Sequence, residues 1–162
     1  MPEVASLTIF HVIISLVAIV AGIALAYGLL TLRRFDRWTL VFMVTTALTL
    51  VTGFLFPYGG LTPAINVGIL CSAIFIPTAL GRYVFHMNGA WRIVFVVGAL
   101  MLFYFNCLVL IVQSFQKIPA LNALAPLGNE PPILAAQSAL LVVFIIIGIL
   151  SVRRFRPALL TA

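Results

Sequence analysis

Four polar side chains lie within long apolar stretches of the sequence, and they are the first candidates for chemistry. His11 lies in the first stretch. Asn106 and Gln113 lie in the fourth, seven residues apart, which is close to two helical turns and places them on one face. Gln137 lies about one turn inside the fifth stretch. Polar groups are costly inside a bilayer, so these four are candidate ligand-binding residues.

A further candidate feature is the segment Gln113–Pro132, QSFQKIPALNALAPLGNEPP, which separates two apolar stretches. Its own apolar part is too short to cross a bilayer. Pro119 can open a short helix there, and we expect that helix to lie in the outer interface as a lid. The segment therefore predicts a covered ligand pocket with the candidate residues His11, Asn106, Gln113, Lys117, Glu130 and Gln137.

The same inventory argues against most catalytic classes. No Asp or Glu lies within an apolar stretch, so a Ser–His–Asp set and a membrane-embedded proton carrier are both disfavoured. The two cysteines cannot form a zinc cluster, which needs about four ligands. His11 and His86 should lie near opposite ends of the bundle, so they cannot bind one haem together. The sequence predicts no catalytic residue and no metal site, names no cofactor, and leaves a haem held by a single histidine open.

The composition requires a lipid environment. Hydrophobic residues make up 64% of the 162 residues and charged residues 7%, with a mean hydropathy of +1.28. A soluble domain has about 25% charged residues. The net charge of +6 does not indicate nucleic-acid binding, because the basic residues lie at the ends of apolar stretches, where membrane orientation signals are found.

Five apolar stretches are long enough to cross a bilayer, which takes about 20 helical residues. Lipid offers no hydrogen-bond partners, so each stretch should be a helix. The sequence predicts an all-α membrane protein, a single bundle of five transmembrane helices in one domain, residues 1–162. The expected spans are approximately 7–32, 39–56, 63–85, 91–115 and 133–152.

The arginines predict the orientation of this bundle. With five spans, all eight fall on one side and Lys117 falls on the other. Basic residues favour the cytoplasmic side, so the N-terminus is expected outside and the C-terminus in the cytoplasm. These arginines are also predicted to contact anionic lipids: Arg33, Arg34, Arg37, Arg82, Arg92, Arg153, Arg154 and Arg156.

Three strings carry a resemblance: TGFLFP at 52–57, NGAWR at 88–92 and VQSFQKIPAL…LAP…EPP across 112–132. They resemble a family of small bacterial inner-membrane proteins for which no activity is assigned. The resemblance covers the second to fifth expected helices. It implies a multi-pass protein of the bacterial inner (plasma) membrane, and it implies no activity, cofactor or site residue.

Three functions follow from these observations. The absence of charge and reactive groups within the membrane favours a non-catalytic accessory or assembly subunit, whose partners would be a larger membrane complex or further copies of the chain. The first alternative is a binder or carrier of a small or lipid-like ligand, such as a quinone, in the outer pocket. The second alternative is a membrane redox protein or cytochrome with a single-histidine haem.

Overall fold

The computed structural model describes residues 2–33, 35–57, 60 and 62–155, and these residues form helices joined by short turns and one longer segment, with no strand among them. Five helices are long and apolar enough to cross a membrane, which confirms the all-α prediction and gives the architecture of a multi-pass membrane protein. The elements are α1 (Pro2–Thr31), α2 (Asp36–Phe54), α3 (Pro63–Ala79) continued by the π-helical turn η1 (Leu80–Val84), α4 (Trp91–Lys117), α5 (Pro119–Asn122) and α6 (Pro131–Arg154).

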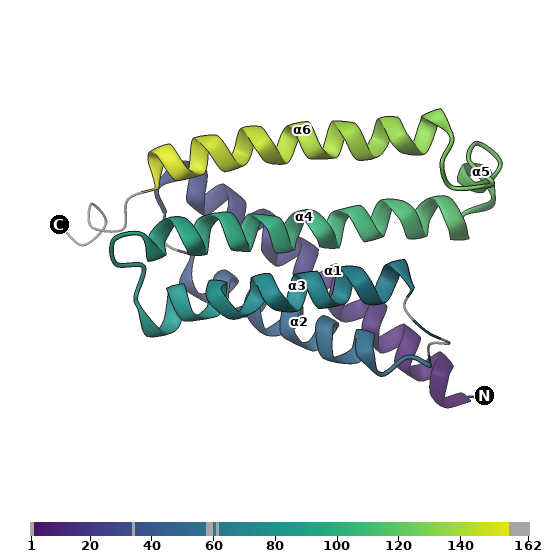
Figure 1. The fold of residues 1–162 in the computed structure, drawn as a ribbon, viewed down its shortest axis with the longest axis horizontal. Coiled ribbons are helices and arrows are strands. Elements are labelled where there is room, and N and C mark those ends of the chain that lie inside the picture. The colour runs from purple at the N-terminus through teal and green to yellow at the C-terminus, as the bar shows by residue number, and fades with distance from the viewer. Residues whose placement is uncertain (1, 34, 58–59, 61, 156–162) are drawn as a thin grey trace.

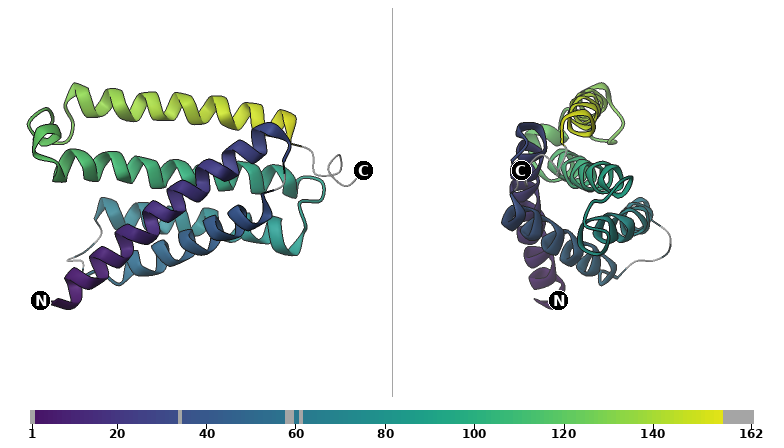
Figure 2. Two further views of the ribbon diagram at one scale, coloured as in Figure 1. Left: turned by 180° about the vertical axis from the view of Figure 1, so that it is seen from behind. Right: turned by 90° about the vertical axis from the view of Figure 1, so that its left-hand side faces the viewer.

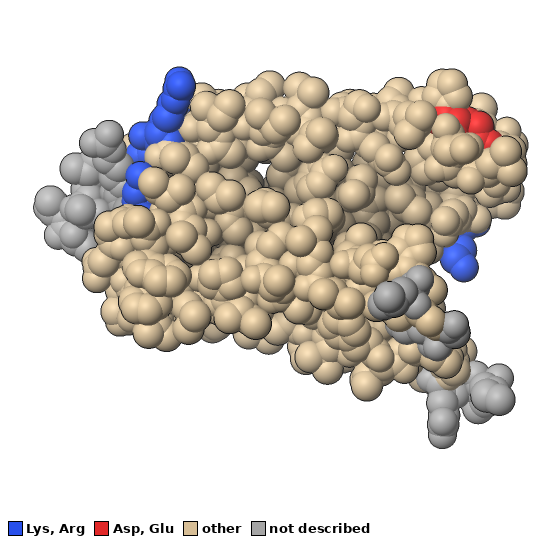
Figure 3. Space-filling model, in the orientation of Figure 1, with Lys and Arg blue, Asp and Glu red and all other residues tan. Residues whose placement is uncertain are grey.

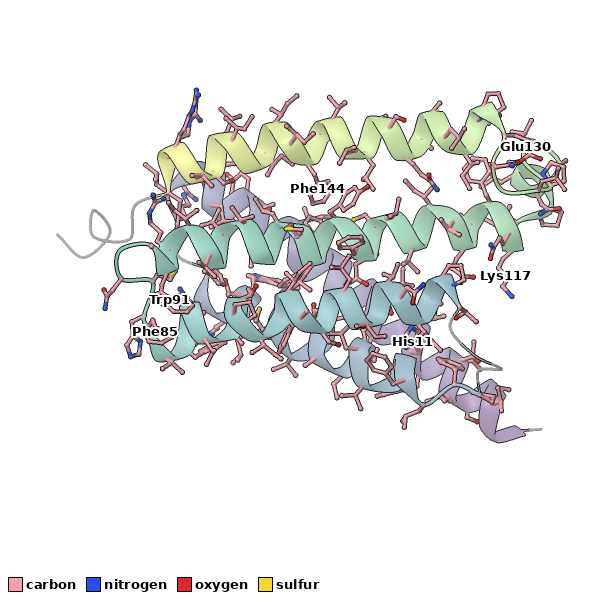
Figure 4. The ribbon with its side chains drawn as sticks, viewed as in Figure 1. His11, Phe85, Trp91, Lys117, Glu130 and Phe144 are labelled. Carbon is pink, nitrogen blue, oxygen red and sulfur yellow. The ribbon has the colours of Figure 1, made fainter. Side chains whose placement is uncertain are left out.

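The long helices run between two ends of the bundle (Figure 1). We call one the arginine end, where α1 and α6 finish and the turn between η1 and α4 lies, and the other the lysine end, where α4 finishes. Lys117 and Glu130 lie at the lysine end, and the described arginines lie at the other (Figures 3 and 4). Arg34 and Arg156 lie outside the described residues.

Helix α1 crosses the bundle diagonally, so that it packs along α2 but approaches α4 and α6 only toward the arginine end (Figure 2). Small residues form part of its contact face. Ala18 and Ala21 are fully buried, and Gly22 lies so close to α4 that an added Cβ would be 2.5 Å from the Phe103 ring. Small residues allow such close approach between membrane helices.

Helix α6 packs mainly against α4, and most of its surface is exposed. Phe144 of α6 lies edge-on to Phe103 and Tyr104 of α4, with ring centroids 5.0 Å and 5.6 Å away (Figure 4). At the arginine end, the Arg92 guanidinium donates to the backbone carbonyls of Val152 and Phe155 at 2.9 Å and 2.6 Å. These bonds satisfy carbonyls that the end of a helix would otherwise leave unpaired.

Two arginines therefore have partners within the protein. Besides the bonds of Arg92, the guanidinium of Arg82 forms an ion pair with Asp36 and lies 5.4 Å from the centre of the Phe95 ring. Arg33, Arg37, Arg153 and Arg154 are exposed. The exposed arginines are the better candidates for contacts with lipid head groups, since their guanidinium groups are accessible.

Candidate functional site

A cavity of about 590 Å³ lies between α1, α2, α3 and α4, in the half of the bundle toward the lysine end. It exists because α1 diverges from α4 beyond their contact at Gly22, as the view from behind shows (Figure 2). The walls are mainly aliphatic and aromatic. The polar residues that line it are His11, Ser15, Thr46, Thr49, Thr62, Asn106, Gln113 and Gln116.

The cavity extends from the lysine end to the middle of the bundle. Its floor is formed by Ile19, Thr46, Cys71 and Leu102, each the lining residue of its helix nearest the arginine end. From Leu102 to the last lining residue of α4 is 14 positions, or roughly 21 Å along the helix. The cavity is therefore long enough to hold a chain-like molecule.

The cavity is also open at its side. Val12 and Leu16 of α1 and Val109 of α4 belong to its lining, and they are 48%, 44% and 41% exposed. In a membrane, these side chains would meet lipid. A hydrophobic molecule could therefore enter from the bilayer without crossing water.

His11 is fixed to the wall of the cavity by a bond to α2. Its Nδ1 lies 2.7 Å from the Thr52 hydroxyl, and its ring meets the Phe56 ring edge-on with centroids 5.4 Å apart (Figure 4). The other ring nitrogen, Nε2, has no hydrogen-bond partner among the described residues. The imidazole thus has one nitrogen engaged in the fold and one available.

Two further polar groups at the cavity lack partners within the described part of the chain. The Asn106 amide is half-buried and forms no hydrogen bond there. The Thr46 hydroxyl is buried without a partner, with the residue only 3% exposed. By contrast, Thr45, Thr49 and Thr52 bond back to carbonyls of their own helix, as expected for threonines packed in a membrane helix. A buried hydroxyl without a partner is unusual. Protein atoms enclose this oxygen, so Thr46 lines the cavity with other atoms of the residue.

The structure brings three of the six predicted pocket residues together and separates the others. His11, Asn106 and Gln113 line the cavity, whereas Lys117, Glu130 and Gln137 do not. Gln137 lies on α6, which contributes no residue to the lining.

The expected lid is present as a short helix but in a different place. Helix α5 opens at Pro119 as predicted, and it packs against the end of α4 rather than over the cavity. The Asn122 side chain donates to the carbonyl of Phe115 at 3.3 Å. No residue of 117–137 lines the cavity, so the prediction that this segment roofs the pocket was wrong.

Glu130 serves the fold of this segment. Its carboxylate accepts from the backbone N–H groups of Leu127 and Asn129 at 2.8 Å and 3.0 Å. These bonds, that of Leu127 foremost, hold the pKa of Glu130 below its usual value because they stabilise the ionised form. The carboxylate bonds to the loop and not to the start of α6, although Glu130 immediately precedes that helix.

The sequence interpretation missed Thr46 and Gln116. Thr46, Thr49 and Gly53 recur at intervals of three and four residues, which places them on one face of a helix. That face lines the cavity. The pattern was visible in the sequence, but it does not distinguish a cavity wall from ordinary helix packing.

The described residues contain no group of three or more His, Cys, Asp or Glu side chains that could hold a metal ion. Cys71 at the floor of the cavity and Cys107 are free thiols. His86 lies in the turn at the arginine end, far from His11. Comparisons with protein families, with characterised proteins and with solved structures found no match to this chain.

Proposed function

We propose that this membrane protein binds or carries a lipid-like small molecule in the cavity between α1 and α4. The observation that supports this is the cavity itself, about 590 Å³ with mainly apolar walls and a few polar groups. Sites for small molecules commonly measure about 300–1,000 Å³ and have this composition. No catalytic step is proposed.

The positions of the polar groups describe the expected ligand. His11 lies near the mouth and Asn106 further in, while Thr46 lies at the floor. A flat or chain-like amphiphile, such as a quinone, would bury its apolar surface against the aliphatic walls and bond its polar group to His11 or Asn106. It would enter between α1 and α4, where the lining is exposed.

This proposal ranks ligand binding above the accessory-subunit function that the sequence favoured. The sequence interpretation rested on the absence of reactive groups, which disfavours most catalytic classes but does not require a partner protein. The cavity adds a positive observation for ligand binding, because its size and mainly apolar walls are those of a small-molecule site. Assembly into a larger complex is compatible with ligand binding and would use other surfaces.

We also propose that the protein lies in the bacterial inner membrane with its arginine end in the cytoplasm. The support is the gathering of basic residues at the arginine end (Figure 3). With that end in the cytoplasm, the cavity mouth would face the outer side. The exposed arginines at that end would contact anionic lipids. Reporter tags on the two termini should fall in different compartments, and tags in the same compartment would refute the five-span orientation.

Solvent extraction of the purified protein tests the ligand-binding proposal. We expect mass spectrometry of the extract to find an amphiphile enriched over the bulk lipids. Val109→Trp places a large side chain at the lateral opening of the cavity and should reduce the enrichment. Val142→Trp is the matched control, because Val142 is an exposed residue of α6 outside the cavity.

A second pair of substitutions distinguishes the loss of a polar contact in the cavity from general effects of mutation. Gln113→Ala removes an amide from the cavity mouth and should weaken retention of the extracted molecule. Gln137→Ala removes an amide from α6 and should leave retention unchanged. An extract identical to bulk lipid in the wild-type protein would refute the proposal, and a haem spectrum in the visible range would favour the cytochrome alternative instead.

A further inference from the structure

The contacts of Thr52 fix which nitrogen of His11 carries a proton. The Thr52 hydroxyl oxygen lies 2.7 Å from the carbonyl oxygen of Leu48 and 2.7 Å from Nδ1 of His11. A hydroxyl has one proton to donate, and a carbonyl oxygen can only accept. Because two oxygens at 2.7 Å require a proton between them, the hydroxyl proton points to Leu48.

Nδ1 of His11 must then donate to Thr52, and so it carries a hydrogen. In the neutral imidazole, Nε2 is consequently a bare acceptor. Among the side chains that the structure describes, no Asp or Glu lines the cavity that could stabilise an additional proton on the ring, and no Lys or Arg lines it that could donate to Nε2. Nε2 of His11 can therefore accept a hydrogen bond from a ligand in the cavity but cannot donate one.

His11 differs from the other polar groups of the cavity, because its free nitrogen can only accept a hydrogen bond. The side-chain amides of Asn106 and Gln113 can each donate or accept. They can bind either a carbonyl or a hydroxyl group of a ligand. Of these groups, only the His11 imidazole, held by Thr52, distinguishes the two.

We infer that the ligand carries a hydroxyl group that donates a hydrogen bond to Nε2 of His11. The inference rests on the proposed function and specifies its ligand class, a hydroxylated amphiphile. Two sources have this chemistry: the reduced form of a quinone, which has two phenolic hydroxyls, and a lipid with a free alcohol, such as a diacylglycerol. An oxidised quinone offers only carbonyl acceptors and would leave Nε2 unpaired.

Binding of matched ligand pairs to the detergent-solubilised full-length protein tests the inference. One pair is a decyl-substituted hydroquinone and its quinone, and the other is a diacylglycerol and its acetyl ester. One hydrogen bond gained corresponds to roughly two- to tenfold tighter binding of the hydroxylated member. A preference in the first pair assigns a quinol, and a preference in the second assigns a lipid alcohol.

Two substitutions of His11 separate hydrogen-bond polarity from shape. His11→Gln places an amide near the position of Nε2, and because an amide both accepts and donates, it should raise the affinity for the quinone to that for the hydroquinone. His11→Asn keeps a donor near the position of Nδ1 but has no group at Nε2, so it should lower the affinity for the hydroquinone to that for the quinone.

The outcomes distinguish the inference from the proposed function. Equal binding of both members of each pair to the wild-type protein, or tighter binding of the quinone, would overturn the inference while leaving a ligand-binding cavity. Binding of none of the four would also overturn it, and the proposed function would still be decided by the solvent extract.

The tautomer can be measured without any ligand. The chain has two histidines, so ¹⁵N-histidine labelling of the His86→Asn variant leaves the signals of His11 alone. We expect a protonated Nδ1 and a bare Nε2. Thr52→Val removes the acceptor and should release this preference, whereas Thr45→Val, on the same helix but without a bond to His11, should leave it unchanged. A protonated Nε2 with a bare Nδ1 in the wild-type protein would overturn the inference.

Discussion

The contact between α1 and α4 at Gly22 gives a quantitative prediction about stability. A Cβ at this position would lie 2.5 Å from Cδ2 of Phe103 and 2.8 Å from two more atoms of the same ring. Phe103 cannot move freely, because it is 5% exposed and packs edge-on against Phe42 and Phe144. The helices must therefore separate in Gly22→Ala, and overpacking of this kind costs about 1–3 kcal/mol.

Gly148→Ala is the matched control for this substitution. Gly148 lies within α6, and an added Cβ there meets nothing within 4 Å. Both substitutions gain the same intrinsic helix propensity, about 1 kcal/mol at most. The difference in unfolding free energy between the two variants therefore isolates the clash, and we expect Gly22→Ala to be the less stable by about 1–3 kcal/mol.

The measurement is reversible unfolding in mixed detergent micelles, followed by circular dichroism. The penalty of Gly22→Ala should disappear in a Phe103→Ala background, since the ring atoms that cause the clash are then absent. If Gly22→Ala is as stable as Gly148→Ala, or if the penalty persists without the Phe103 ring, then α1 does not approach α4 as described. The origin of the cavity would then need another explanation.

Two other substitutions test contacts at the ends of the bundle. Arg92→Met removes the donors to the last carbonyls of α6 and should lower the unfolding free energy by about 1–3 kcal/mol. Arg153→Met, at an exposed position, should change the unfolding free energy little. Equal effects of the two substitutions would contradict the role of Arg92. Glu130→Gln should speed hydrogen exchange at the amides of Leu127 and Asn129 at neutral pH. Because the folded pKa of Glu130 is lowered, its contribution to stability is present above the unfolded pKa and is lost as the pH falls through the lower, folded value. Exchange that is equal in the wild type and the variant at neutral pH would contradict this.

The sequence predicted the long helices well because a bilayer leaves few alternatives. An apolar stretch must be helical and must match the hydrocarbon thickness, so composition alone placed the boundaries within a few residues. The largest difference is at the start of α1, which begins at Pro2 and not near Leu7. The extra turn lies before the apolar stretch, and the hydrocarbon thickness does not constrain the length of a helix outside the apolar region.

The neighbours of each helix could not be predicted in the same way. Asn106 and Gln113 were assigned to one face because both lie on a single helix, and both line the cavity. Gln137 was assigned to the same pocket only because its place in the sequence predicts a similar depth in the membrane. Its helix packs on another side of α4, and hydropathy contains no information about which sides of two helices meet.

The lid was misplaced for a related reason. The prolines and leucines of 118–127 indicate a short interfacial helix, which is present, but they do not indicate what lies beneath it. The position of α5 follows from the α4–α6 contact, because the segment has to connect those two helices. The cavity opens where α1 diverges, and that divergence depends on close packing at Gly22.

The lysine end has a practical consequence for experiments. Lys117 is the only lysine of the chain, it is exposed, and it directly follows Gln116 of the cavity mouth. Apart from the terminal amine, an amine-reactive dye or crosslinker has this one target. A fluorophore or photoreactive group attached there would sit beside the entrance without any engineered cysteine, and it would report directly on molecules that enter or leave.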